Sequence, residues 1–282
     1  MKGLGDTMKK LLLLILLPLL LSAYSDNDLD GVEDKDDLCP NTSLIELVDN
    51  HGCTIERLIE TKKHDKSSYD IILGAGESKN SVNKTESKTL TESLQVDYFY
   101  KKFSIQLQSS YFSMSSDNYE KSGISDTYFG AYYRVNLADK LRINLGARLN
   151  IPTYKSDLDN NNLDYTLSTS VNYKVNKFTL LAGLGYTFIN DNDINNTSYT
   201  LNYQNSFNYH MGIGYFFTSR LYANLSYLHS QSIYKGNDDL SSASFYGHYA
   251  IDANWFSTLS YSKGLSDEAT DQSTALRVGY YF

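Results

Sequence analysis

The sequence predicts an all-β protein: a transmembrane, antiparallel up-and-down β-barrel of about twelve strands. Three observations lead to this fold class. Apolar residues recur at every second position from Ser67 to Phe282, which is the period of a strand with one apolar face. The alternating runs mostly reach about ten residues, whereas globular strands average roughly five or six. The links between the runs alternate between tight turns and longer polar stretches, as the two ends of a membrane barrel do.

The stretch 140–152 shows the alternation clearly. Its odd positions from 141 to 151 are all apolar, while its even positions carry Arg142, Asn144, Gly146, Arg148 and Asn150. The stretches 162–175 and 271–282 alternate in the same way. Counting such runs predicts strands near 69–76, 88–100, 103–114, 124–136, 140–152, 162–175, 177–189, 198–217, 219–231, 241–252, 255–264 and 271–282.

The connections predict which end of the barrel carries the loops. We expect short turns at 101–102, 137–139, 176, 218 and 253–254. Longer polar links are expected at 77–87, 115–123, 153–161, 190–197, 232–240 and 265–270. In hydrocarbon every backbone N–H and C=O must find a partner within the protein, so a sheet that crosses lipid has to close on itself. An even number of strands returns both chain ends to one side, expected to be the periplasm.

The polar positions of the alternation are expected to line the lumen. The charged residues assigned to it are Asp97, Asp126, Arg134, Arg142, Arg148, Asp164, Lys174, Asp252 and Arg277. The amides assigned to it are Gln106, Gln108, Asn144, Asn202, Gln204, Asn208 and Asn224. Two interpretations stay open: the arginines form a cationic ladder that favours anionic solutes, or they pair with lumen aspartates and hold the barrel's shape. A slip of one residue would exchange the two faces.

Residues 1–25 are predicted to be a signal peptide. Lys9-Lys10 precede the apolar run 11–21, and Ala23-Tyr24-Ser25 offers small residues where a signal peptidase cleaves, before Asp26. The run has about half of the ~20 residues that a membrane-spanning helix needs. We therefore expect export, with the barrel in the outer membrane and the segment after the cleavage site in the periplasm.

Carboxylates recur at the spacing of a calcium-binding loop directly after the predicted cleavage site. The expected ligands are Asp26, Asp28, Asp30, Asp34, Asp37 and the backbone carbonyl of Val32. They occupy loop positions one, three, five, nine, twelve and seven, and Gly31 stands at position six, where such a loop turns sharply. Asp37 departs from the pattern, which usually has a bidentate Glu there. We expect Ca²⁺ to be structural, because so short a module buries little core.

Two cysteines follow this loop. The pattern D-x-D-x-D-G-x-x-D-x-x-D-x-C-P, ending at Cys39-Pro40, and the later D-x-x-G-C, ending at Cys53, resemble a thrombospondin type 3 calcium repeat over residues 26–53. Because these are the only 2 Cys of a chain expected to be exported, a Cys39–Cys53 disulfide is expected. The alternative is an acidic, solvated tail with two unrelated thiols. Residues 54–66, with a modest helical stripe, are predicted to link this head to the barrel at 67–282.

The C-terminal end carries two further resemblances. Val278-Gly279-Tyr280-Tyr281-Phe282 resembles the C-terminal signal of proteins inserted by the outer-membrane assembly machinery, which the resemblance implies as a partner. The stretch 261–267 and the final strand resemble the closing hairpin of the phenol-degradation-pathway transporter family of barrels. Both resemblances imply a Gram-negative outer-membrane barrel in contact with lipid. A soluble β-sandwich or adhesin stack would also have two-faced strands, but strand length and loop rhythm favour the barrel.

The composition narrows the function. A net charge of -8, a pI near 5.1 and no visible basic patch argue against nucleic acid as a partner. We expect a porin-like channel or passive transporter for small solutes, whose selectivity comes from lumen width and polar side chains. The alternative is a structural or surface-interaction protein with an occluded lumen, whose Asn-, Asp- and Ser-rich outer loops bind a partner.

A lipid hydrolase is the third interpretation. His229 is followed by Ser230, Ser232, Asp238 and Asp239 near an outer strand end, and a hydrolase needs a nucleophile and a base within hydrogen-bond reach. The stretch lacks the His-x-Ser-Asn pattern of outer-membrane lipid hydrolases. His210 and His248 are expected to be polar lumen residues, so we expect no catalytic residues and no enzyme.

The calcium loop is testable on the exported chain. Calorimetric titration with Ca²⁺ should show binding heat that is lost when Asp28→Ala and Asp30→Ala are combined, because two carboxylate ligands disappear. Heat that is unchanged in the double variant would refute the site.

Overall fold

The structure, a computed structural model, is built of strands wherever it describes the chain in regular elements. It describes Leu38 and residues 67–82, 85–117, 119–138, 140–154, 162–195 and 200–282. The predicted signal peptide, calcium repeat and linker at 1–25, 26–53 and 54–66 therefore lie outside the described residues, apart from Leu38. No helix among the described residues is long and apolar enough to cross a membrane.

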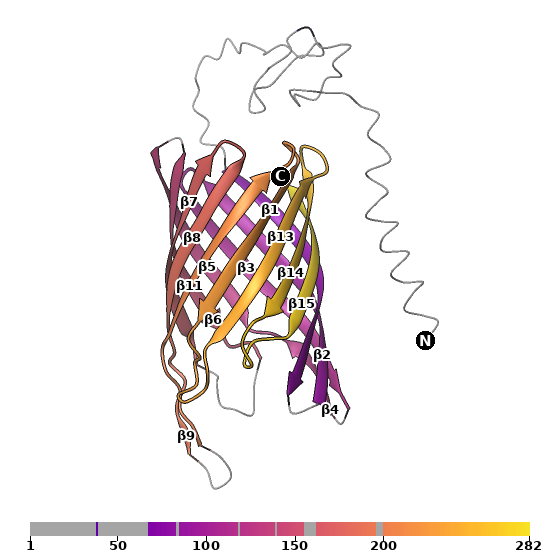
Figure 1. Cartoon of the computed structure of the whole chain (residues 1–282), viewed down its shortest axis with the longest axis vertical. Coiled ribbons are helices and arrows are strands. Elements are labelled where there is room, and N and C mark those ends of the chain that lie inside the picture. Colours follow the sequence, from indigo (N-terminus) through magenta and orange to yellow (C-terminus); the bar gives the residue numbers. More distant parts are fainter. Residues whose placement is uncertain are drawn as a thin grey trace, which may run out of the picture. The chain divides into compact units, whose positions relative to one another are not determined.

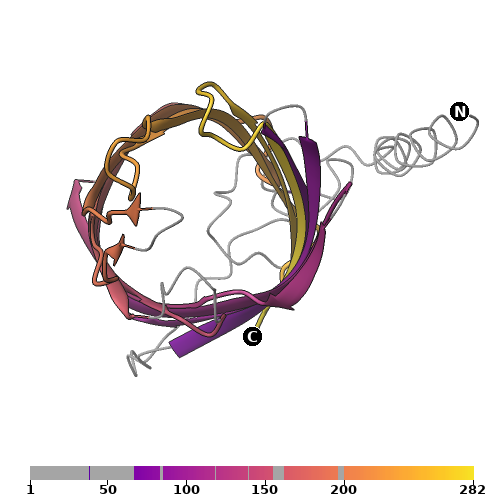
Figure 2. The same ribbon diagram turned by 90° about the horizontal axis from the view of Figure 1, so that it is seen from below.

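One antiparallel sheet closes into a barrel (Figures 1 and 2). Its order is β2-β1-β15-β14-β13-β12-β11-β8-β7-β6-β5-β3-β4, with β2 also paired to β3. The strands are β1 (Ser67–Val82), β2 (Thr85–Tyr100), β3 (Phe103–Ser116), β4 (Tyr119–Ile124), β5 (Thr127–Ala138), β6 (Leu141–Ile151), β7 (Asp164–Val175), β8 (Phe178–Phe188), β9 (Ile194–Asn195), β10 (Thr200–Leu201), β11 (Ser206–Phe216), β12 (Leu221–Ser230), β13 (Leu240–Ala250), β14 (Trp255–Gly264) and β15 (Gln272–Tyr281). The closing pair is β1 with β15, from Asp70↔Tyr281 to Lys79↔Gln272. The predicted all-β, up-and-down barrel is confirmed.

The closed sheet has twelve spanning strands, as predicted, because β4 and β5 form one interrupted strand. Both pair with β3, β4 with its end (Tyr111–Ser116) and β5 with its start (Phe103–Gln108). The interruption at Ser125-Asp126 shifts the alternation by one residue: Phe112 of β3 faces the odd-numbered Gly123, whereas Gln108 faces the even-numbered Tyr128. This shift is a bulge-like irregularity that re-aims side chains near the loop end of the barrel.

Cross-strand register keeps one polar face and one apolar face continuous around the barrel. On the polar face Asp97 lies opposite Gln106, Gln106 opposite Gly130, and Gly130 opposite Arg148. Exposure is inverted relative to a soluble protein: Leu225 is 61% exposed, whereas Asp97 is 8% exposed. Such a continuous apolar outer surface requires apolar surroundings.

Aromatic residues form belts near both ends of this outer face. At the turn end Tyr69 stacks on Phe282, with ring centroids 4.5 Å apart. At the loop end Tyr165 stacks on Phe188 at 4.6 Å. On β7, Tyr165 and Tyr173 are separated by about 26 Å of strand, at roughly 3.3 Å per residue. Aromatic belts at this spacing are typical of the two interfaces of a membrane.

Two predicted loops are strands instead. The link predicted at 77–87 is the continuation of the β1–β2 ladder to Val82↔Thr85, and most of the link predicted at 115–123 is the end of β3 and β4. The period-two alternation of apolar residues is lost there because both faces of the hairpin are polar. An ion pair between Glu77 and Lys88, with Oε2 and Nζ 2.8 Å apart, illustrates this polarity. A ladder that is solvated on both faces keeps its backbone hydrogen bonds without an apolar stripe, so hydrophobic periodicity did not detect it.

The strand predicted at 198–217 starts later than expected, at Ser206. The residues before it turn aside into the small β9–β10 hairpin. The Tyr203 N–H donates to Asp193 Oδ1 (2.8 Å), and Gln204 N–H donates to the Ile233 carbonyl (2.8 Å). Loop-to-loop hydrogen bonds thus replace the barrel ladder above β11.

The short turns lie together at the opposite end. Lys101 and Asn176 adopt the left-handed conformation, with φ of 55° and 56°, as tight turns between long strands require. In the β13–β14 turn the Asp252 carboxylate accepts hydrogen bonds from the N–H groups of Asn254 (2.8 Å) and Trp255 (2.7 Å). These two bonds favour the ionised carboxylate, so they lower the pKa of Asp252.

The Asp252 turn predicts a pH-dependent stability. Because its pKa is lowered in the folded barrel, its contribution is full above the unfolded pKa and is lost as the pH falls through the folded value. Asp252→Ala should lower the heat-unfolding temperature slightly at pH 7, and the difference from wild type should shrink in acid. Heat-dependent gel mobility measures this, with Asp267→Ala in the β14–β15 loop as the control. Equal stability at pH 7 would contradict the role of the carboxylate.

Candidate functional site: the barrel lumen

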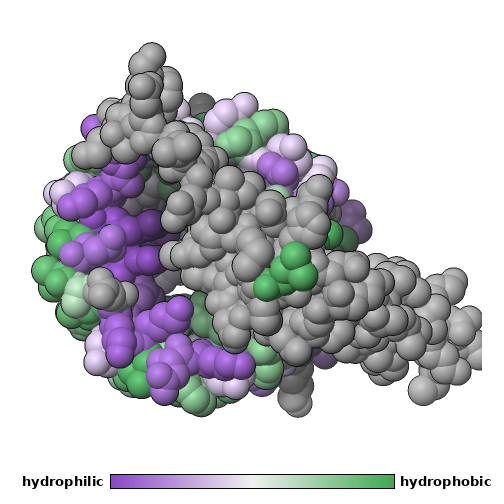
Figure 3. Space-filling view, turned by 90° about the horizontal axis from the view of Figure 1, so that it is seen from above, coloured by the Kyte–Doolittle hydropathy of each residue, from purple (hydrophilic) through white to green (hydrophobic). Residues whose placement is uncertain are grey.

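The polar face lines the inside of the barrel. In the part of the rim left uncovered in Figure 3, hydrophilic residues lie along the inner surface and hydrophobic ones along the outer surface. The predicted lumen charges that lie on this face within a strand are Asp97, Arg134, Arg142, Arg148, Asp164, Lys174 and Arg277. Four of the cations are exposed and the two carboxylates are buried within the wall, while Arg277 is partly buried.

Four cations make up one sector of the inner surface, which we call the cationic wall. Its members are Arg134, Arg142, Arg148 and Lys174. They lie on β5, β6 and β7, which are consecutive strands, and all four are exposed. Among the described residues none of them has an ion-pair partner within 4.0 Å. Within the described residues, no arginine of the cationic wall therefore pairs directly with a lumen aspartate.

Aromatic rings support part of the cationic wall. The Arg148 guanidinium lies 5.1 Å from the centroid of the Tyr128 ring, and Lys174 Nζ lies 5.5 Å from that of Phe216. Such contacts attract a cation through the ring's quadrupole without cancelling its charge. The cationic wall therefore keeps a positive potential that faces the lumen.

Two lumen carboxylates fix loops. Asp126 accepts hydrogen bonds from Tyr154 N–H (3.2 Å) and Asn150 Nδ2 (3.5 Å). Asp164, 7% exposed, accepts one from Asn190 N–H at 2.8 Å. Charge-assisted bonds to backbone N–H groups hold a chain segment firmly. Both acids thus fasten the loop-end connections to the barrel and present little charge to the lumen.

A polar chain crosses the strands where the barrel closes. Arg277 Nη1 donates to Gln95 Oε1 (3.2 Å), and Gln95 Nε2 donates to Asp97 Oδ2 (2.7 Å). The three side chains belong to β15 and β2, on either side of β1. Arg277 is therefore engaged with the wall through Gln95, unlike the cationic wall residues. This chain joins the last strand to the second one across the closing strand.

Large inner side chains lie flat against the wall because the neighbouring strand carries a glycine beneath them. A Cβ built on the glycine would overlap the side chain in each case. The pairs are Gly183 with His210, Gly214 with Tyr222, Gly279 with Phe256, and Gly146 with Tyr132. Each glycine thus leaves a space at the wall, which we call a glycine niche, for a bulky neighbour that would otherwise extend into the lumen.

Aromatic residues occupy the sector opposite the cationic wall. The rings of His248 and Phe256 are stacked at 5.3 Å, and those of Phe256 and Tyr281 at 4.5 Å. These residues, with Tyr246, belong to β13, β14 and β15. In a ring of twelve strands, β13–β15 lie six places from β5–β7. The lumen therefore has a cationic wall on one side and an aromatic wall, Tyr246, His248, Phe256 and Tyr281, on the other.

Three residues predicted for the lumen lie outside the barrel strands. Asp252 is in the exposed β13–β14 turn, because β13 ends at Ala250 and the strand alternation does not continue to residue 252. Asn202 and Gln204 precede β11, in the segment that turns aside. Gln204 Nε2 donates to the Ser232 carbonyl at 2.9 Å, so its amide joins two loops.

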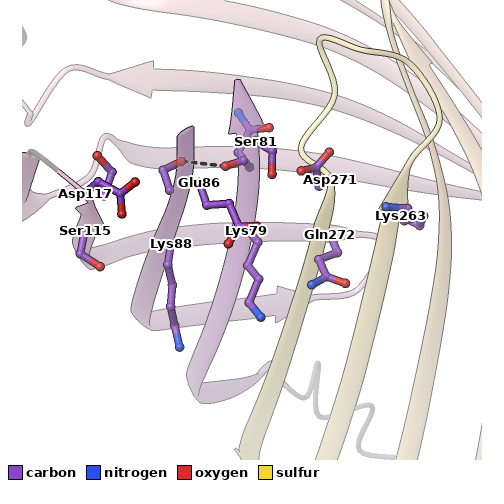
Figure 4. Close-up of a pocket in the computed structure, with 12 residues that line it drawn as sticks. Lys79, Ser81, Glu86, Lys88, Ser115, Asp117, Lys263, Asp271 and Gln272 are labelled. Atoms are coloured by element: carbon purple, nitrogen blue, oxygen red, sulfur yellow. Dashed lines mark hydrogen bonds between the residues drawn. The ribbon is translucent and has the colours of Figure 1, made fainter. Parts of the chain in front are cut away.

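A separate pocket of about 760 Å³ lies at the loop end, beside the extended hairpins (Figure 4). Side chains of both signs line it, namely Lys79, Lys88 and Lys263 with Glu86, Asp117 and Asp271. Its charges largely compensate one another, so it does not share the uniform sign of the cationic wall. We assign it to the solvated extension of β1, β2 and β3 together with the adjoining loop-end residues of β14 and β15.

No metal-binding cluster of His, Cys, Asp or Glu occurs in the part of the chain that the structure describes. The predicted calcium ligands, Asp26 to Asp37, and the predicted Cys39–Cys53 disulfide lie outside that part. Both remain predictions from the sequence.

The surroundings of His229 differ from those expected. Ser230 lies on the lumen side, where its Oγ is 3.3 Å from Ser206 Oγ. Ser232 is buried in the loop, 4% exposed. The hydroxyl that contacts His229 belongs instead to Ser241, its cross-strand partner on β13. Sequence proximity did not identify this contact, because strand pairing brings together residues twelve positions apart.

The glycine niches predict a defect in the lumen. Gly214→Ala should push Tyr222 into the lumen, lower single-channel conductance, and destabilise the barrel by about 1–3 kcal/mol, as overpacking does. Adding Tyr222→Ala should restore conductance. The control is Gly247→Ala, where the nearest atom to a new Cβ is at 3.6 Å. Unchanged conductance in Gly214→Ala would show that Tyr222 does not limit the lumen.

Comparison with known proteins identifies a family whose model matches most of the chain. The family model described as "Putative MetA-pathway of phenol degradation" matches residues 82–282. A search of curated proteins found no match. The translocator domain of the autotransporter NalP from Neisseria meningitidis is 12% identical, with a TM-score of 0.50 over 77% of this chain and 88% of that one. This likeness supports the barrel fold.

Two transport barrels are similar at a lower level. They are the KdgM porin (13% identity, TM-score 0.47, 76% of this chain and 98% of that one) and the P. putida toluene transporter TodX (8%, 0.43, 77% and 90%). The family match covers well over half of the chain and includes the closing hairpin in which the sequence resembles this family. The chain belongs to the MetA-pathway phenol-degradation family.

Proposed function

We propose that this protein is an outer-membrane channel through which small organic anions diffuse. The observation that carries the proposal is the cationic wall: four exposed cations on consecutive strands, without ion pairs among the described residues, inside a closed barrel. A barrel with an apolar exterior and a charged interior needs hydrocarbon outside and water inside. The aromatic belts at both ends support the membrane position.

An accessible lumen is supported by exposure on the inner face. Arg134, Arg142, Arg148 and Ser168 face inward and are nevertheless exposed. Leu228, also on the inner face, is 41% exposed. A lumen filled by interlocking side chains would bury such residues, as small eight-stranded barrels do. The glycine niches add to this by keeping His210, Tyr222 and Phe256 against the wall.

The preference for anions follows from how the charges are distributed. The acids Asp97 and Asp164 are 8% and 7% exposed and are hydrogen-bonded within the wall. The exposed charge on the inner face of β5, β6 and β7 is therefore positive, which raises the local concentration of anions. The aromatic wall on the opposite side supplies a surface for the apolar part of a solute. Small carboxylates with an aromatic or aliphatic body match both walls.

The alternative function, a surface-interaction protein with an occluded lumen, predicts a folded barrel that conducts no ions. The inner-face exposure favours the channel. The predicted calcium-binding, disulfide-linked head at 26–53 remains part of the proposal as a periplasmic module, with Ca²⁺ in a structural role. Insertion by the outer-membrane assembly machinery also remains part of it.

Conductance in planar bilayers tests the channel. The refolded full chain should give discrete steps, and a salt gradient should give a reversal potential of anion-selective sign. Combining Arg134→Gln, Arg142→Gln and Lys174→Gln should move that potential toward cation selectivity, because the exposed positive charge is removed. The matched control, Lys263→Gln, removes a lysine outside the lumen and should leave selectivity unchanged.

Solute uptake tests the substrate class. Proteoliposomes should admit benzoate faster than benzylamine, which has a similar size and the opposite charge, and the triple variant should lose the difference. A correctly folded barrel without conductance steps would refute the channel and support the surface-interaction function. A cation-selective channel would refute the preference for anions but would leave the channel function standing.

A further inference from the structure

A polar cluster faces outward at the loop end of β12 and β13, within the aromatic belt. Its members are His229 on β12, Ser241 on β13, and Asp239 in the connection just before β13. His229 and Ser241 are cross-strand partners on the outer face. The side chains of His229 and Asp239 are 23% and 43% exposed, so the cluster is open to the surroundings of the barrel. It lies on the opposite face of the sheet from the lumen.

The distances have the order of a nucleophile, a base and an orienting acid. Ser241 Oγ lies 3.1 Å from His229 Nδ1, and His229 Nε2 lies 3.4 Å from Asp239 Oδ2. With the proton on Nε2, that N–H lies beside the Asp239 carboxylate and Nδ1 is available to accept the Ser241 O–H. Many serine hydrolases on unrelated folds arrange these three groups in this order.

Neighbouring groups hold each member in place. Asp239 Oδ1 accepts a hydrogen bond from Ser232 N–H at 3.1 Å, which leaves Oδ2 directed to the histidine. The Tyr209 ring lies 5.0 Å from the His229 ring. The Tyr227 hydroxyl lies 3.0 Å from Ser241 Oγ and can donate to it. A site in which each side chain is fixed by a further contact is preorganised for reaction.

From this geometry we propose that Ser241, His229 and Asp239 form a second site, on the outside of the barrel, which hydrolyses acyl esters of membrane lipids. Its position selects the substrate: the aromatic belt lies at the level where headgroups meet acyl chains, and the ester bonds of lipids lie at that level. The proposal does not depend on the channel function, because the two sites use opposite faces of the strands.

The reaction balances without any group beyond water. Ser241 Oγ attacks the ester carbonyl carbon while its proton passes to His229 Nδ1. The C–O bond to the lipid alcohol breaks, and that alcohol takes the proton from His229, leaving an acyl-Ser241. Water then attacks the acyl carbon, gives its proton to His229, and releases the fatty acid as Ser241 regains its proton. The Tyr227 hydroxyl, 3.0 Å from Ser241 Oγ, would donate to the oxyanion that forms at each attack.

Lipid hydrolysis by the full chain, refolded in detergent–phospholipid micelles, tests the site. Fatty acid release from a diacyl glycerophospholipid and from purified lipid A distinguishes the two sources of ester. We expect turnover of at least one, loss of turnover in Ser241→Ala and His229→Ala, and retention in Ser230→Ala, which removes the neighbouring lumen-side hydroxyl. A fluorophosphonate should label Ser241, as read by mass spectrometry of the peptide.

Asp239 is a positioning residue and has a separate readout. Asp239→Asn keeps an oxygen for Ser232 N–H but places an N–H donor beside His229 Nε2, which favours the tautomer that cannot accept the Ser241 proton. We expect kcat to fall by about 10³-fold or more with KM nearly unchanged. A merely structural role would instead alter heat stability and leave labelling of Ser241 intact.

Two outcomes would overturn the proposal. The first is a folded wild-type barrel, verified by heat-dependent gel mobility, that neither releases fatty acid nor reacts with the fluorophosphonate. The second is hydrolysis that persists in Ser241→Ala, which would identify a contaminating hydrolase. Either result would leave the cluster as a hydrogen-bond network of the aromatic belt, and conductance measured on the same preparation would be unaffected.

Discussion

The absence of hydrogen-bonding partners in hydrocarbon is the constraint on which the whole barrel depends. A sheet in that environment has to satisfy every backbone N–H and C=O internally. Here β1 pairs with β15 over the whole length of β15, from Gln272 to Tyr281, and no open ladder is left at the closure. Once the sheet is closed, each strand has one face toward the membrane and one toward the lumen. The inverted exposure of Leu225 and Asp97 follows from this geometry.

Because the wall is only one sheet thick, the length of a charged side chain decides whether its charge stays in the wall or reaches the lumen. Carboxylate side chains such as that of Asp164 are short, so they stay within the wall and accept hydrogen bonds from backbone N–H groups. Arginine and lysine are longer and extend beyond the wall, and the charges on β5, β6 and β7 therefore reach the lumen. The chain carries a net charge of -8, yet the exposed charge in this sector of the lumen is positive. Net charge alone would have suggested the opposite selectivity.

The two faces of one strand can also carry two separate chemistries. On β12, Tyr222 and Ser230 point to the lumen, while Tyr227 and His229 point outward. The outward cluster of His229, Ser241 and Asp239 lies within the aromatic belt of the outer face, which the lumen residues do not reach. A substitution on one face therefore leaves the other face unchanged, provided that the strand register is kept.

Sequence alone determined the fold class, the approximate strand positions and the alternation, because a strand between lipid and water must repeat every two residues. It also pointed to the family, through the closing hairpin that ends at Phe282. Hydrophobic periodicity could not detect the solvated ends of β1, β2 and β4, which have no apolar face. It also assigned Asp252 to a strand that had already ended.

Only the tertiary structure decided which residues meet across strands. The exposure of the cationic wall, the glycine beneath Tyr222, and the contact of Ser241 with His229 all depend on register between strands. Local sequence contains the period of each strand but not its alignment with the next one. That alignment is set by closure of the ring, in which every strand must match two neighbours at once.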